Sequence, residues 1–161
     1  MSYEVEIGRG KRGRRAYSLD DIALIPARRT RDPEDVNVGW QIDAYHVDIP
    51  IMAAPMDSVM SPKTAIEFGK LGGIGVLDLD GLWTRYEDAD AVLEEIEQLD
   101  EEHSIARLQQ IYSEPIKPEL ITARLQEIRQ AGVVVAGKLS PQRTQRYWRS
   151  VVEAGVDLFV I

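Results

Sequence analysis

The sequence predicts an α/β fold built around a parallel sheet. Short apolar runs alternate with amphipathic helical stretches along the chain, and the runs are continuously apolar. Continuous runs are typical of strands buried on both faces, as in parallel sheets. Regular alternation of strand and helix indicates right-handed βαβ units. Four such strands fit either a small open sheet or half of a closed barrel, and composition alone does not decide between them.

The expected strands are four apolar runs, each bounded by Gly, Pro or polar residues. They cover residues 49–54, 73–77, 133–137 and 156–161. The last run ends the sequence at Ile161, where an uncovered strand edge would be an aggregation hazard. We therefore expect the native chain to continue and to supply the neighbouring strand.

Helical stretches separate these strands. Ser61 can cap the first helix, and Pro62 suits its first turn. Thr84 and Glu87 match a capping box, which predicts the start of the next helix. Pro118 begins a further one. The apolar side chains expected to face inward include Ala65, Ile66, Leu71, Leu120, Ile121, Leu125, Ile128, Trp148, Val151 and Val152.

The N-terminal region is different in composition. Residues 1–16 are polar and basic, and we interpret them as a flexible arm because they contain too little apolar surface to pack a core. A phosphate or nucleic-acid contact is the alternative. Residues 17–48 are expected to form an extension that packs on a domain beginning at residue 49. The basic side chains of the arm are Arg9, Lys11, Arg12, Arg14 and Arg15.

Charge and composition exclude several classes of function. The formal net charge of −8 disfavours binding to nucleic acid or to an anionic membrane. No apolar run approaches the roughly 20 residues of a membrane span, and the N-terminus has no signal region, so we expect a cytoplasmic protein. The chain has no Cys and only 2 His, so we expect no metal site built from these side chains.

Three motifs, in order along the chain, resemble the IMP dehydrogenase/GMP reductase family. They are Leu19–Pro26, Ile49–Val59 and Gly72–Gly75. The similarity extends over residues 17–81 and resumes at the last two strands. It implies a TIM (β/α)8 barrel with parallel strands inside and helices outside. Such a barrel needs about 250 residues, so the 161 residues of this chain would form its N-terminal half, over residues 49–161.

Two segments depart from the usual pattern of that family. Many members insert a pair of CBS domains where this chain has a helical stretch over residues 84–131, so it resembles the IMP-dehydrogenase-related proteins that lack the pair. Typical members also have a His-Lys-Asn-like triplet, near the nicotinamide, where this chain has Asp78, Leu79 and Asp80. The second departure leaves the cofactor preference and the direction of the reaction open.

The resemblance implies an NAD(P)-dependent oxidoreductase of guanine nucleotide biosynthesis that converts IMP, NAD and water into xanthosine monophosphate and NADH. The alternatives are a GMP reductase, which uses NADPH and releases ammonia, and a nucleotide-binding relative without catalysis. A cysteine nucleophile is expected beyond residue 161, because a thiolate both attacks and leaves readily. We therefore expect this chain alone to be inactive. The resemblance also implies a homotetramer and a monovalent cation, K⁺.

The candidate site residues follow from the rule that barrel active sites lie at the C-terminal ends of the strands. By resemblance, Ala54, Met56, Asp57 and Ser58 would bind the nucleotide, and Asp78, Leu79 and Asp80 the cofactor. Met56 can pack on the purine or simply within its loop. Asp57 either touches the ligand or, as we prefer, holds the loop through backbone N–H groups, because a carboxylate repels phosphate. Asp78 and Asp80 either contact ribose hydroxyls or are exposed loop carboxylates.

Overall fold

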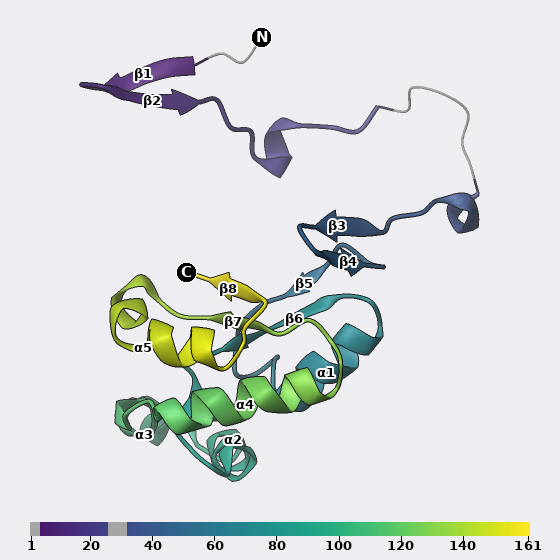
Figure 1. Ribbon diagram of the computed structural model, residues 1–161. Helices are drawn as coiled ribbons and strands as arrows, with labels where there is room; N and C mark the ends of the chain where they lie inside the picture. Colours follow the sequence, from purple (N-terminus) through teal and green to yellow (C-terminus); the bar gives the residue numbers. More distant parts are fainter. Residues whose placement is uncertain (1–3, 26–31) are drawn as a thin grey trace. The chain divides into compact units, whose positions relative to one another are not determined.

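The structure is a computed structural model that describes residues 4–25 and 32–161, with the side chains of 101–103 left aside (Figure 1). The chain divides into two compact units, Met1–Asn37 and Val38–Ile161. The boundary therefore falls inside the segment 17–48, and residues 38–48 belong to the same unit as the sheet.

The second unit is built on a four-stranded sheet in the order β5-β6-β7-β8. All three neighbouring pairs are parallel, as the sequence predicts. Spatial neighbours are also successive strands of this sheet along the chain, which is the arrangement of consecutive βαβ units in a barrel wall. The strands are β5 (Met52–Ala53), β6 (Ile74–Asp78), β7 (Ala136–Lys138) and β8 (Leu158–Val160).

Every strand differs in its bounds from the apolar run that predicted it. β5 has only two residues, lies at one edge of the sheet and pairs with β6. The third strand, β7, is shifted toward the C-terminus relative to its apolar run, so that Lys138 pairs with Asp78. The apolar runs mark which segments are buried, whereas the ladder depends on which backbone groups find a partner.

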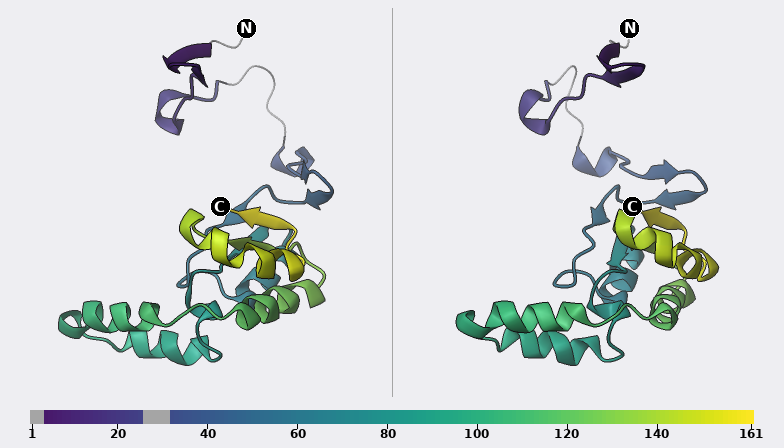
Figure 2. Two further views of the ribbon diagram at one scale, coloured as in Figure 1. Left: turned by 60° about the vertical axis from the view of Figure 1, so that its left-hand side comes forward. Right: turned by 90° about the vertical axis from the view of Figure 1, so that its left-hand side faces the viewer.

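Five α-helices accompany the sheet in the described part of the chain. α1, α4 and α5 lie along one face of the sheet (Figure 1). α2 and α3 form a pair that extends away from it (Figure 2), joined by Arg107 Nη2, which donates to Glu95 Oε2 at 3.1 Å. The helices are α1 (Pro62–Lys70), α2 (Ala89–Glu97), α3 (Glu101–Ser113), α4 (Pro118–Gln130) and α5 (Pro141–Glu153).

The observed N-termini of the helices confirm most of the capping and proline signals in the sequence. The Ser61 hydroxyl accepts from the Thr64 N–H and caps α1. The capping box at Thr84 is a wrong prediction: Thr84 ends a buried 3-10 turn, Leu82–Thr84, and Asp88 caps α2 instead. The Thr84 hydroxyl donates to Leu79 O at 2.9 Å, so it is not free to serve a helix N-terminus.

The core has two layers, one on each face of the sheet. Leu77 and Leu79 pack with the helices, whereas Val76 and Ala136 belong to a smaller cluster on the other face. All four inward positions predicted on α4 are buried, as are Ala65 and Val151. Other predicted inward residues are exposed because they lie on the outer faces of their segments: Leu71, Trp148 and Val152.

A short hairpin covers the N-terminal ends of the strands in the second unit. It consists of β3 (Trp40–Ile42) and β4 (Tyr45–Val47), which pair antiparallel. Val47 packs in the smaller core cluster. The Tyr45 hydroxyl donates to Asp157 Oδ1 at 2.8 Å. The Asp157 carboxylate also accepts from the Val135 N–H at 2.9 Å, so it joins the hairpin to the sheet.

The first unit contains an antiparallel hairpin of β1 (Glu4–Gly8) and β2 (Lys11–Arg14). The segment 1–16, which we interpret from its sequence as a flexible arm, thus contains a hairpin over residues 4–14. Gly8 and Gly10 adopt positive φ at the turn, which glycine allows at little cost. In the described part of the chain no helix has the length and apolar character needed to cross a membrane.

Candidate functional site

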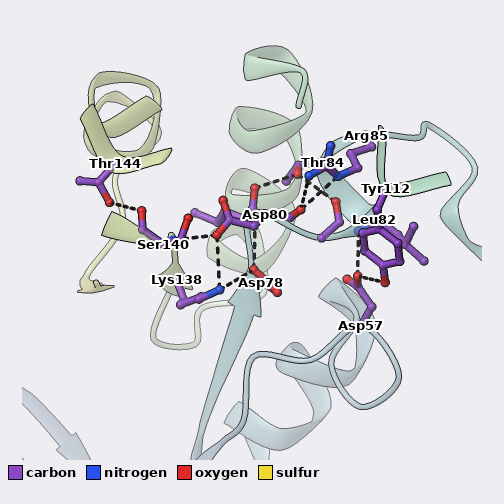
Figure 3. A network of polar contacts seen from close by, with 12 residues as sticks. Asp57, Asp78, Asp80, Leu82, Thr84, Arg85, Tyr112, Lys138, Ser140 and Thr144 are labelled. Carbon is purple, nitrogen blue, oxygen red and sulfur yellow. Dashed lines mark hydrogen bonds and ion pairs between the residues drawn. The ribbon is translucent and has the colours of Figure 1, made fainter. Parts of the chain in front are cut away.

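A network of polar contacts joins the C-terminal ends of β5, β6 and β7 (Figure 3). The loops that follow these strands contain most of the predicted site residues. Their backbones are held together by carboxylates, each of which bridges two loops. The strand ends therefore form one connected surface, at the end of the sheet where barrel enzymes bind their substrates.

Asp57 connects the loop after β5 to the loop after β6. Its Oδ2 atom accepts from the Leu82 N–H at 3.0 Å and from the Tyr112 hydroxyl at 2.8 Å. A Cβ atom at Gly81 would clash with Asp57 Oδ1, so only glycine allows the carboxylate to lie this close to the backbone. The loop-holding role of Asp57 is thus visible in its contacts with a backbone N–H.

Asp78 and Lys138 are directly paired across β6 and β7. Lys138 Nζ lies 3.5 Å from Asp78 Oδ1 and 3.3 Å from Asp80 Oδ2. Burial raises the pKa of Asp78, although Lys138 opposes the shift. Burial alone would lower the pKa of Lys138, but the two carboxylates outweigh it and raise the pKa. Lys138 therefore stays charged between two acidic groups at neutral pH.

Asp80 connects the loop after β6 to the loop after β7. Its Oδ2 atom accepts from the Ser140 N–H at 2.7 Å as well as from Lys138. The side chain of Asp80 is 17% exposed. Its Oδ1 atom is buried and has no hydrogen-bond partner among the described residues. Asp80 is thus an ordered carboxylate with one free acceptor, rather than an exposed loop charge.

Arg85 fixes the backbone of the same loop. The guanidinium donates to Asp80 O through Nε at 3.0 Å and through Nη2 at 2.8 Å. Its Nη1 atom donates to Glu114 O, at the end of α3. The residue is 6% exposed, and buried charges need such partners. Arg85 therefore ties the helical stretch between β6 and β7 to the loop that carries Asp78 and Asp80.

The remaining predicted site residues occupy two environments. Ala54, Met56 and Ser58 are exposed in the loop after β5, and the Met56 side chain is 52% exposed. Leu79 is fully buried in the core. Its side chain cannot reach a cofactor, because alternation along the strand turns it toward the helices with Leu77.

Sequence reasoning missed Tyr112 and Arg85 as members of this network; it placed residues 138–140 at a strand end of the active-site face but gave Lys138 no role. Lys138 had a usable signal, since it follows an apolar run and precedes the start of a helix. Tyr112 and Arg85 had none: each makes contacts with residues in other segments, and spacing along the sequence does not reveal them.

The arrangement suits a ligand that offers hydrogen-bond donors. The buried Oδ1 atoms of Asp57 and Asp80 have no partner in the described part of the chain, so each can accept one further hydrogen bond. A cavity of about 610 Å³ adjoins Asp57 and Ser58 on the side of α2. Carboxylates at such positions commonly bind ribose hydroxyls, so Asp80 is the residue of this network that could hold a nucleotide cofactor.

Comparisons with known proteins agree with this architecture. The profile of the IMP dehydrogenase / GMP reductase domain family matches residues 16–161. A protein named an uncharacterized oxidoreductase from Mycolicibacterium smegmatis is 42% identical over 162 residues, which are 98% of this chain and 43% of the relative. An inosine-5′-monophosphate dehydrogenase from Methanocaldococcus jannaschii is 36% identical over 64 residues, covering 40% of this chain and 13% of that enzyme.

A solved structure extends the comparison to the fold. The IMP dehydrogenase/GMP reductase-like protein from Corynebacterium glutamicum has a TM-score of 0.81 and 41% identity, over 98% of this chain and 44% of that one. The parallel strands and helices of the second unit are thus the N-terminal half of a TIM barrel. The chain spans less than half the length of these relatives.

Proposed function

This chain belongs to the IMP dehydrogenase/GMP reductase family, and from that premise we propose that the protein containing it is an NAD(P)-dependent purine-nucleotide oxidoreductase that oxidises IMP. The observation that carries the proposal is the exposed loop 54–58, joined by Asp57 to the neighbouring strand end. It lies at the end of the sheet where barrel enzymes react. The names of the relatives support an oxidoreductase in general terms.

The loop after β5 supplies the nucleotide contacts in this proposal. The thioether of Met56 packs against the purine, which polarisable sulfur favours. Ala54 leaves space beside the ring, and the Ser58 hydroxyl can donate to an oxygen of the nucleotide. Asp57 holds the loop in place through Leu82 N–H. Because its carboxylate would repel phosphate, we give it no direct contact with that group.

The loop after β6 supplies the cofactor contacts. In this proposal Asp80 accepts a hydrogen bond from a ribose hydroxyl through Oδ1, because its Oδ2 atom already accepts from the Ser140 N–H and from Lys138. The nicotinamide cofactor, when bound, takes up or delivers the hydride. Lys138 balances the charge of Asp78 and Asp80, and thereby keeps two acidic side chains together near the cofactor. Leu79 contributes to the core beneath them.

A second candidate reaction is the reduction of GMP with NADPH. Asp78 and Asp80 stand where the family usually has a His-Lys-Asn-like triplet, and two carboxylates with one ammonium create a different charge near the nicotinamide. The α2–α3 pair stands in place of the regulatory CBS domains. Both features favour including the reductase in any test.

We further propose that the nucleophilic cysteine, a K⁺ site and the surfaces of a homotetramer belong to the complete protein. The acidic net charge of this chain agrees with a protein that works in the cytoplasm on small molecules rather than on nucleic acid.

The proposal is tested with the complete protein and two substrate pairs, IMP with NAD and GMP with NADPH. Nicotinamide absorbance reports turnover in both directions. We expect turnover of IMP with NAD and none by the 161-residue chain alone. Turnover of GMP with NADPH alone would identify the protein as a GMP reductase instead. Binding of nucleotide without turnover of either pair would favour the non-catalytic alternative. Robust turnover by the isolated chain would refute the half-barrel account.

A further inference from the structure

Tyr112 reaches the nucleotide loop from a distant helix. It lies near the end of α3, and its hydroxyl donates to Asp57 Oδ2 at 2.8 Å, across 55 residues of sequence (Figure 3). The same oxygen accepts from the Leu82 N–H at 3.0 Å. The carboxylate of Asp57 thus accepts one hydrogen bond from the loop after β6 and one from α3.

The environment of Tyr112 keeps its hydroxyl protonated. Partial burial raises the pKa of Tyr112, and the hydrogen bond to Asp57 together with the charge of that carboxylate raises it further. A phenol with a raised pKa remains a donor throughout the neutral range. The contact with Asp57 is therefore a charge-assisted hydrogen bond, which is stronger than a neutral one.

Packing does little to hold the middle of the loop 54–58. Ala54, Met56 and Ser58 are exposed, and the cavity of about 610 Å³ lies against Asp57 and Ser58. The first apolar side chain after the loop that is fully buried is Met60. Since few side-chain contacts fix this segment, its position depends on the hydrogen bonds of Asp57.

The end of α3 that carries Tyr112 is itself firmly anchored. Ile111, its neighbour, is 1% exposed, and Ile111 O accepts from the Tyr86 hydroxyl at 2.9 Å. Two residues beyond Tyr112, Glu114 O accepts from buried Arg85. A side chain mounted on so well fixed a backbone can hold a less constrained partner.

We propose that Tyr112 is a positioning residue, which holds the loop 54–58 in its nucleotide-binding conformation through Asp57. The inference rests on the proposed function, because it assigns to that loop the binding of a purine nucleotide. In this arrangement α3, the second helix of the α2–α3 pair, directly supports the loop 54–58.

The test compares Tyr112→Phe with Tyr45→Phe in the complete protein. Each substitution removes one phenol hydroxyl that donates to a carboxylate at 2.8 Å, but Tyr112 contacts Asp57, whereas Tyr45 contacts Asp157 at the opposite end of the sheet. For Tyr112→Phe we expect KM for the nucleotide to rise about 5- to 20-fold, with KM for the dinucleotide unchanged. Tyr45→Phe should leave both constants within about twofold of the wild type.

Hydrogen exchange of the loop amides gives a readout that needs no turnover. The Val59 and Met60 N–H groups both donate to Met56 O, so their exchange reports whether the loop is closed. We expect Tyr112→Phe to exchange faster than wild type at both amides, and Tyr45→Phe to exchange like wild type there.

Equal nucleotide KM values in the two variants would overturn the inference, as would equal exchange. If Tyr112→Phe lost more stability than Tyr45→Phe and KM for both substrates rose together, Tyr112 would be a purely structural residue, and that result would also overturn the inference. If the wild-type protein turns over neither substrate pair, the proposed function fails. In that case faster exchange in Tyr112→Phe alone still supports the holding of the loop by Tyr112, and equal exchange refutes it.

Discussion

Replacement of Asp157 by Ala should lower the free energy of unfolding by about 1–4 kcal/mol. The Val135 N–H would lose its acceptor at 2.9 Å, and Val135 is fully buried, so this loss alone costs about 1–3 kcal/mol. Arg129 Nη2 would lose an ion pair at 2.7 Å. Because the Arg129 side chain is 46% exposed, that loss adds at most about 1 kcal/mol.

The pH dependence of this effect has a definite sign. Burial raises the pKa of Asp157, but the Val135 N–H, Arg129 and Tyr45 outweigh it, and the net pKa is lowered. Because the carboxyl pKa is lowered, the stability that ionised Asp157 contributes is fully present above the unfolded-state pKa of about 3.9. That contribution is lost as pH falls through the folded-state pKa. The difference between wild type and variant should thus be constant above about pH 5 and shrink below about pH 4.

Urea unfolding of the complete protein at several pH values measures the difference. Asp48→Ala is the matched control, because the Asp48 side chain is 82% exposed and lies 3.6 Å from His46. It should change the free energy of unfolding by less than about 0.5 kcal/mol. A loss below about 0.5 kcal/mol in Asp157→Ala, or a difference that grows as pH falls, would refute the reasoning.

Three other predictions concern the candidate site. Asp78→Asn should raise the free energy of unfolding at pH 7, measured in urea. Burial raises the pKa of Asp78, so its ionised form destabilises the folded state above that pKa. A gain in stability that persists below about pH 3 would contradict this reasoning. Gly81→Ala should displace Asp57 by steric clash, destabilise the protein by about 1–3 kcal/mol and raise nucleotide KM. Met56→Ala should raise nucleotide KM about 2- to 10-fold without changing the melting temperature, since the side chain is 52% exposed; an unchanged KM would remove Met56 from the site.

The sequence was sufficient for the order of strands and helices, because burial leaves continuous apolar runs that length and flanking Gly or Pro residues distinguish. It was not sufficient for the ladder. The run 133–137 predicts the third strand, yet pairing occurs over Ala136–Lys138, because register depends on the partner strand. That shift brings Lys138 into the site, opposite Asp78.

The candidate site was predictable where it follows a strand end and unpredictable where it depends on tertiary contacts. Asp57, Asp78 and Asp80 meet because the C-terminal ends of parallel strands lie together. Leu79 was included for its place in a motif, although strand alternation assigns it to the core with Leu77. Tyr112 reaches Asp57 only through the packing of α3, which no local pattern encodes.

The most direct test of the central claim is hydrogen exchange of the complete protein with and without IMP. If the C-terminal ends of the strands bind the nucleotide, protection should appear over residues 54–58 and extend to the loop that begins at Asp78. Protection confined to the opposite end of the sheet, around Tyr45, Arg129 and Asp157, would contradict the account.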